Sequence, residues 1–332
     1  MRNLVLICLM ALSSFSFADT VNVYSFRQPF LIEPILESFT QETGIRAKVI
    51  FAKKGLIQRI KREGKLSPAD VVLTSNFSKL LQLKTDGLTQ AADTKGDIEN
   101  NVPVQFRDSE GHWVALTKRV RNIYSSKTRQ GKLDINYEDL ASAQYKGKIC
   151  TRSGKHPYNL GLIASMIAHN GEAQTKTWLQ GVKNNLARKP QGNDRAQVKA
   201  IKEGLCDISL GNSYYLGKML NDKKQIPWAN AVELNFPNQT NRGSHINVSG
   251  AVIAKYSPNK KAAQALLNYL TTEKAQALYA ELNMEYPVNK AVAPSKLVNS
   301  WGTFKEDDIK LEDVAANIKT ALKLTDQTKF DL

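Results

Sequence analysis

Strands and helices alternate from Val21 to Leu73, and this order restricts the chain to a small group of folds. The first strand is followed by a helical repeat that ends at Gly44, and a second helix ends at Gly64. The next strand, 71–73, is an unbroken apolar run, which is typical of a strand covered on both faces. A β-α-β-α-β order predicts a parallel sheet with helices on both sides.

The same alternation restarts further along the chain. Strands are predicted at 148–151, 186–189, 207–210 and 247–253. Asp194 and Asn212-Ser213 are assigned as caps of the helices that follow. The sequence therefore predicts two α/β lobes, with the chain crossing back late. Ligands of such sheets bind beyond the carboxyl ends of the strands, so we expect a cleft there.

Residues 1–18 have the pattern of a secretory signal peptide. Arg2 precedes a short apolar run, 4–12, and Ser16-Phe17-Ala18 is a small-x-small cleavage site. The run is too short to span a bilayer. We expect cleavage after Ala18, export to the periplasm and no membrane insertion of the mature chain.

Export would leave two cysteines, Cys150 and Cys206, in an oxidising compartment where a disulfide can form. The predicted strands place them side by side but about three residues out of register, which at ~3.3 Å per residue exceeds the usual separation of a bridged pair. The sequence alone favours neither the bridged nor the free form of the two cysteines.

The chain is strongly basic, with 46 Lys and Arg against 31 Asp and Glu. These residues are scattered, and no tract interleaves basic with aromatic side chains as in single-strand binders. We therefore expect an exported monomer with no nucleic-acid partner. Salt-dependent binding to DNA or anionic lipid would favour a surface-binding protein instead.

Three tyrosines follow neighbouring strands of the second lobe at or near helix starts: Tyr158, Tyr214 and Tyr215. A phenolate is a hard anionic ligand that suits Fe(III), whereas softer metals prefer thiolate or imidazole. Each phenol, of pKa ~10, must lose a proton to bind, so binding should weaken as the pH falls. Each tyrosine taken alone is also compatible with ordinary packing.

Three phenolates leave an octahedral ion incomplete, and a small anion such as carbonate could fill the remaining positions. Arg27, Arg119 and Arg121 are candidate anchors for it, because guanidinium binds planar oxyanions bidentately, and Gln28 could donate a hydrogen bond. The arginines could equally form salt bridges. The residues expected just behind the ligands are Ser153, His156 and Asn212.

Other functions remain open at this point. An oxyanion receptor, for sulfate or thiosulfate, would keep the arginines without needing the tyrosines. A polyamine receptor would need several carboxylates. A hydrolase would need a nucleophile with a base, and Ser153 near His156 is only a faint candidate. We therefore do not expect an enzyme.

Several segments, in chain order, resemble the periplasmic ferric-ion-binding proteins of ABC importers. They are Leu66–Val71 (LSPADV), Lys146–Ser153 (KGKICTRS), Lys189–Asp194 (KPQGND), Asn212–Tyr215 (NSYY) and Glu285–Val288 (EYPV). The resemblance implies a type II periplasmic-binding-protein fold, with two α/β lobes joined by hinge strands. We expect residues 19–118 and 245–293 to form the first lobe, residues 119–244 the second, and residues 294–332 a helical segment on the second.

The resemblance also implies the ligands. In this family the adjacent tyrosine pair binds Fe(III), which corresponds to Tyr214 and Tyr215, and in one branch a third tyrosine, here Tyr158, joins them. Many members carry Arg-His-Tyr after the first strand, whereas this chain has Arg27-Gln28-Pro29. The chain thus looks like the branch with three tyrosines and a synergistic carbonate, which Arg27 and Gln28 would contact. Such proteins deliver iron to an inner-membrane ABC permease.

Overall fold

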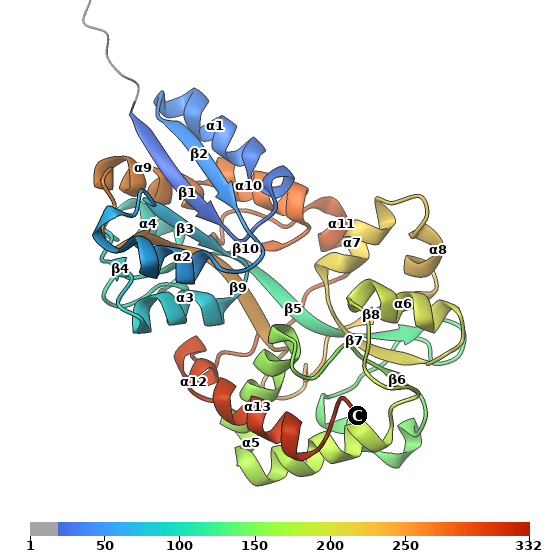
Figure 1. The fold of residues 1–332 in the computed structure, drawn as a ribbon. Coiled ribbons are helices and arrows are strands. Elements are labelled where there is room, and N and C mark those ends of the chain that lie inside the picture. Colours follow the sequence, from blue (N-terminus) through green and yellow to red (C-terminus); the bar gives the residue numbers. More distant parts are fainter. Residues whose placement is uncertain (1–18) are drawn as a thin grey trace, which may run out of the picture.

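The computed structural model describes residues 19–332, which form two α/β lobes built on one mixed sheet. The strand order β2-β1-β3-β9-β5-β7-β6 runs from one lobe into the other (Figure 1). The predicted signal peptide, residues 1–18, lies outside the described residues. Within residues 19–332, no helix has the length and apolar character needed to cross a membrane.

The first lobe confirms the parallel sheet expected from the alternation. β1 (Thr20–Ser25) pairs in parallel with both β2 (Arg46–Phe51) and β3 (Val71–Thr74), and all four residues of β3 are buried. The helices of this lobe are α1 (Glu33–Thr43), α2 (Leu56–Glu63), α3 (Phe77–Thr85), α4 (Asp97–Asn101), α9 (Lys260–Thr271) and α10 (Glu273–Asn283).

Two long antiparallel strands connect the lobes, β5 (Val114–Ser126) and β9 (Ile246–Ala254). β5 pairs with β9 up to Val120 and with β7 from Arg121 onward, so the chain passes between lobes at that point (Figure 1). β5 has no counterpart among the predicted strands, because basic side chains interrupt its apolar pattern. The short strands β4 (Thr89–Gln90) and β10 (Tyr286–Pro287) pair with β9 and β5.

In the second lobe, β6 (Ile149–Cys150) and β7 (Ile208–Asn212) are parallel, and β8 (Val232–Asn235) pairs with β5. The prediction of a strand at 186–189 is wrong, since that segment makes only a single bridge, between Leu186 and Ile149. The helices of this lobe are α5 (Pro157–Asn184), α6 (Asp194–Lys202), α7 (Tyr214–Leu220) and α8 (Ile226–Ala229).

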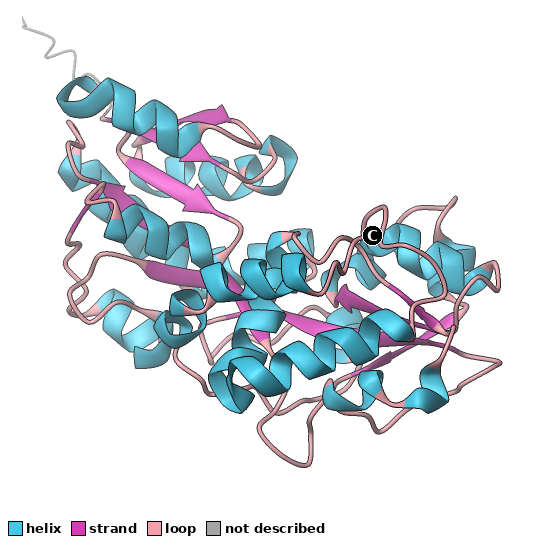
Figure 2. Ribbon diagram, turned by 60° about the horizontal axis from the view of Figure 1, so that its bottom comes forward, coloured by secondary structure: helices cyan, strands magenta, loops and turns pink. Residues whose placement is uncertain are grey.

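The C-terminal segment covers the second lobe. α12 (Leu311–Ala316) and α13 (Ile318–Gln327) lie against α5, and α11 (Lys296–Asn299) lies against α7. α12 also contacts α3 of the first lobe. The chain end thus packs mainly on the second lobe while touching the first (Figures 1 and 2).

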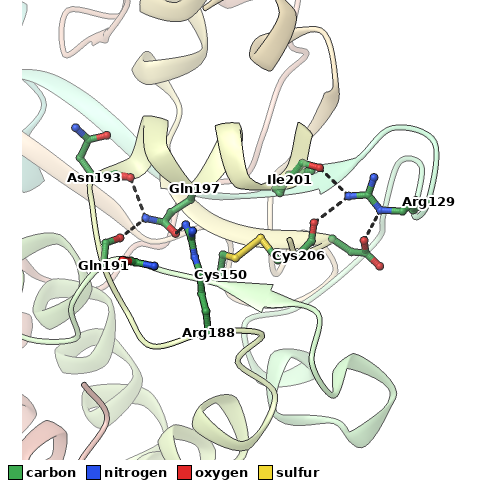
Figure 3. Close-up of a disulfide and its surroundings, with 9 residues drawn as sticks. Arg129, Cys150, Arg188, Gln191, Asn193, Gln197, Ile201 and Cys206 are labelled. Carbon is green, nitrogen blue, oxygen red and sulfur yellow. Dashed lines mark hydrogen bonds and ion pairs between the residues drawn. A yellow bond between two sulfur atoms is a disulfide. The ribbon is translucent and has the colours of Figure 1, made fainter. Parts of the chain in front are cut away.

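A disulfide joins Cys150 to Cys206, with their Cα atoms 5.8 Å apart (Figure 3). The expected offset is real, because Cys150 lies opposite Ser209 in the pairing of β6 with β7. Cys206, however, precedes β7 and lies in the bend that enters it. In that bend the amides of Asp207 and Ile208 both donate to the carbonyl of Lys148, at 2.8 and 3.0 Å. Strand register therefore does not set the separation of the two cysteines.

Candidate metal centre

The three predicted tyrosines meet on one wall of the second lobe. Tyr158 lies in the first turn of α5, and Tyr214 and Tyr215 begin α7. These helices follow β6 and β7, whose parallel pairing puts both carboxyl ends on the same edge. The hydroxyl oxygens of Tyr158 and Tyr214 are 3.3 Å apart, and the ring centroids of Tyr214 and Tyr215 are 4.2 Å apart.

Burial and neighbouring phenols make Tyr214 and Tyr215 weaker acids. Burial, followed by the neighbouring Tyr158 and Tyr215, raises the pKa of Tyr214 well above its ordinary value. Burial and then Tyr158 raise the pKa of Tyr215 to about 12. Tyr214 and Tyr215 are therefore protonated at neutral pH, and a cation that binds them as phenolates must displace their protons.

The tyrosines line a cleft of about 340 Å³ between the lobes. Four cationic side chains line it against one carboxylate, so the cleft is positively charged. Its lining residues are Phe26, Arg27, Gln28, Phe30, Leu31, Ser75, Arg119, Tyr158, Arg195, Tyr214, Tyr215, Lys218 and Glu285.

Arg119 connects the two walls of the cleft. It is buried, and a guanidinium nitrogen donates to the carbonyl of Ser75 in the first lobe. Its guanidinium carbon is 5.8 Å from the ring centroid of Tyr158 and 5.9 Å from that of Tyr214. Its Nε donates no hydrogen bond within the described chain, since the nearest carboxylate oxygen, of Glu285, is 4.0 Å away, and this leaves a donor free to face an anion. The structure thus places Arg119 in the cleft lining.

Arg27 also reaches the cleft, but it is already paired. Its Nη2 donates to Glu285 at 2.6 Å and to Thr117 at 3.1 Å, and both charged side chains are buried. Burial alone would raise the pKa of Glu285, yet Arg27 and Arg119 lower it to about 2, so this carboxylate stays ionised. Gln28, next in the chain, lines the cleft and is exposed.

The assignment of Arg121 to the anion needs correction. Its guanidinium donates to Asp194 at 2.7 Å, to Asn212 at 3.1 Å and to Asn159 at 2.6 Å, all within the buried interior of the second lobe. Arg121 is absent from the cleft lining. A buried cation needs a buried counter-charge, and Asp194 satisfies Arg121 away from the cleft.

The three residues expected behind the ligands have different positions. His156 caps α5, since its Nδ1 accepts from the amide of Tyr158 at 3.2 Å, and its ring stacks edge-on against that tyrosine. The side chain of Asn212 accepts from Arg121 instead of capping α7. The assignment of Ser153 needs correction. Its hydroxyl donates to Asp331, in the C-terminal segment, at 2.6 Å.

The sequence analysis missed two cationic residues of the cleft. Lys218 lies one helical turn after Tyr214, and its ammonium is 5.2 Å from the ring centroid of that tyrosine. Burial, only partly offset by Glu285, lowers the pKa of Lys218 to about 8. Arg195 follows Asp194 in α6 and lines the same cleft. The i, i+4 spacing of Lys218 from Tyr214 was a usable signal, because such residues share a helix face.

Two lobes on crossing strands, with a cleft between them, define the class of protein. Residues 50–305 match the family model described as bacterial extracellular solute-binding protein, and the chain belongs to this family. Among curated relatives it is similar to iron uptake protein A1 of Synechocystis, with 39% identity over 92% of this chain and 86% of the relative.

Solved structures show the same architecture. Ferric iron-binding protein A of Mannheimia haemolytica, in an open conformation, has 57% identity and a TM-score of 0.91, covering 95% of this chain and 100% of that one. A Trichodesmium protein in complex with iron and citrate has 36% identity and a TM-score of 0.89, covering 94% of this chain and 99% of that one.

Proposed function

We propose that this protein binds Fe(III) in the interlobe cleft, together with a synergistic anion, and delivers the iron to an ABC permease of the inner membrane. The observation that carries this proposal is the cluster of Tyr158, Tyr214 and Tyr215 on one wall. The iron-binding names of its relatives and structural neighbours support the same cargo.

The cluster suits a trivalent hard cation. Three phenolates supply three negative charges and oxygen ligands, so Fe(III) is neutralised by the tyrosines alone. A divalent ion would leave a net negative charge and would compensate less of the cost of three deprotonations. Since all three tyrosines belong to the second lobe, iron can load while the cleft is open.

The remaining coordination positions would take an oxyanion such as carbonate or bicarbonate. Arg119 is its main anchor in this proposal, because its buried Nε donates no hydrogen bond in the described part of the chain and is 4.0 Å from the nearest carboxylate oxygen, that of Glu285. Gln28 and Arg27, which is also paired with Glu285, would contact the anion from the first lobe, with Lys218 and Arg195 on the opposite wall. Anion contacts from both lobes would favour the closed state, because only a ligand with greater affinity for that state can shift the equilibrium.

The two alternative cargoes fit less well. A polyamine needs several carboxylates, and Glu285, the one carboxylate in the cleft lining, is already paired with Arg27. Sulfate or thiosulfate would suit the cations but would leave three clustered phenols without a function.

We place the mature protein in the periplasm as a monomer, released from the signal peptide after about Ala18.

The test is a titration of purified iron-free protein with a ferric salt. Phenolate bound to Fe(III) should give a visible charge-transfer band that saturates at one iron per chain. Repeating the titration without bicarbonate tests the role of the anion, and calorimetry with sulfate or thiosulfate in the absence of iron tests the alternative. Heat from sulfate without any ferric band would overturn the proposal.

A further inference from the structure

Asp194 is a fully buried carboxylate that lies behind the tyrosine wall. Its Oδ2 accepts from the guanidinium of Arg121 at 2.7 Å and from the amide of Asn212 at 2.9 Å, and its Oδ1 accepts from Arg152 at 3.0 Å. The sequence assigns Asp194 as a helix cap, but Asn193 performs that role by accepting from the amide of Ala196 at 3.0 Å. The Asp194 carboxylate is thereby available for other contacts.

The contacts of Asp194 with the two arginines lead to the segment that carries Tyr158. Arg152 lies in the loop before α5, and its guanidinium carbon is 5.3 Å from the ring centroid of Tyr158. Arg121 donates to the side chain of Asn159, the residue after Tyr158, at 2.6 Å. Asn159 in turn donates to the carbonyls of that loop, which fixes the start of α5.

The contact of Asp194 with the amide of Asn212 leads to the segment that carries the tyrosine pair. The amide of Asn212 is at the end of β7, two residues before Tyr214, and it donates directly to Asp194. The side chain of Asn212 also accepts from Arg121 at 3.1 Å. One carboxylate therefore contacts both of the chain segments that supply the phenols, although these segments are far apart in the sequence.

We infer that Asp194 is a positioning residue for the metal centre, which keeps the hydroxyl of Tyr158 next to those of Tyr214 and Tyr215. This inference rests on the proposed function. Ligands supplied by two separate segments bind a metal well only when contacts behind them fix their relative positions. Although burial alone would raise the pKa of Asp194, Arg121 and Arg152 keep it below its ordinary value, so the carboxylate remains charged.

The experiment compares Asp194→Asn with a matched variant, Asp108→Asn. Asp108 is also buried, accepts from Lys84 at 2.6 Å and from the amide of His112 at 2.9 Å, and lies in the first lobe away from the cleft lining. Both changes remove a buried charge, and we expect both to lower the unfolding temperature. Only Asp194→Asn should release iron to a chelator faster, by about 10- to 100-fold, with a weakened or shifted charge-transfer band.

A milder variant covers the case in which Asp194→Asn does not fold. Asn159→Ala removes the contact between Arg121 and the start of α5, and we expect a smaller change in the same direction. Crystal structures of the iron-free variants add a measurement without metal, because the 3.3 Å separation of the Tyr158 and Tyr214 hydroxyls should lengthen.

The outcomes separate the two proposals. Wild-type release rates and an unchanged band in the Asp194 and Asn159 variants would overturn the positioning role, as would an equal acceleration in Asp108→Asn. If the wild-type protein gives no ferric band, the proposed function fails. In that case the hydroxyl separation in the iron-free crystals still decides whether Asp194 positions the tyrosines.

Discussion

The hydroxyl oxygens of Tyr158 and Tyr214 are 3.3 Å apart, although 56 residues separate them in the chain. At this distance one phenol can donate to the other, but two phenolates would repel strongly in a buried site. A cation between them removes that repulsion. Under the proposed function, the close approach of the two hydroxyls forms part of a metal site before iron binds, and this can be tested by mutation and by pH.

Each of the variants Tyr158→Phe, Tyr214→Phe and Tyr215→Phe should weaken iron binding. The ring is retained, so packing changes little, but one anionic ligand is lost. We expect iron affinity to fall by at least about 100-fold. This is the upper end of the loss seen when residues that hydrogen-bond to metal ligands are removed, and losing a ligand itself should cost at least as much. Chelator competition followed at the charge-transfer band measures it. Tyr145→Phe, a half-buried tyrosine of the same lobe, is the control. If all three site variants bind iron with the affinity of the wild type, the assignment is refuted.

Iron affinity should fall as the pH is lowered from about 8 to about 5. The pKa values of Tyr214 and Tyr215 lie above their ordinary range, so both phenols are protonated throughout this window and iron binding must release their protons. Mass action then requires that added protons oppose binding. Calorimetry in buffers of different ionisation enthalpy counts the protons released. An affinity independent of pH, with no proton release, would contradict coordination by tyrosinate.

Much of the fold could be predicted because the alternation of apolar strands and helices is local. The unbroken run of β3 and the helical repeats of the first lobe are visible in the sequence and are found in the structure. β5 was missed because Lys118, Arg119 and Arg121 interrupt its pattern, and their charges are compensated only by residues distant in the chain. Local pattern carries no information about such partners.

The site was predictable to a similar extent. The tyrosines follow strand ends, and parallel pairing of β6 with β7 brings them together, which the sequence could indicate. The orientation of each arginine could not be predicted. Arg119 and Arg121 are two residues apart on one strand, and such residues are expected on the same face of the sheet. Arg119 lines the cleft, whereas Arg121 contacts Asp194 in the interior. Only the tertiary position of the carboxylates distinguishes the two.

Replacing both cysteines, Cys150→Ala with Cys206→Ala, should reduce the free energy of unfolding. The bridge spans 56 residues, for which the chain-entropy relation gives about 4 kcal/mol, and measured losses are typically about 2–4 kcal/mol. Urea denaturation of the variant, and of the wild type with and without reductant, measures the loss. The ferric band should persist at 25 °C, because the Asp194 contacts still join the two tyrosine segments. Coincident unfolding curves for the oxidised wild type and the variant would contradict this prediction.

Glu285→Gln should destabilise the protein, and the loss should depend on pH. The change leaves the buried guanidinium of Arg27 without its counter-charge, which costs about 3–5 kcal/mol. Burial alone would raise the pKa of Glu285, but Arg27 and Arg119 lower it to about 2. A carboxyl with a lowered folded pKa contributes stability that is fully present above its unfolded pKa, about 4.3, and is lost as the pH falls towards 2.

The difference in unfolding free energy between wild type and Glu285→Gln should therefore be largest at pH 5 to 7 and should narrow between about pH 4 and pH 2, where protonation removes the charge from the wild-type carboxyl as well. Glu281→Gln, an exposed carboxylate in α10, is the control and should change stability by less than about 0.5 kcal/mol at any pH. Urea denaturation at pH 6 and pH 3 measures both differences. If the difference in unfolding free energy between wild type and Glu285→Gln is the same at both pH values, the ionised carboxylate is not the source of the stability that the Arg27–Glu285 pair provides.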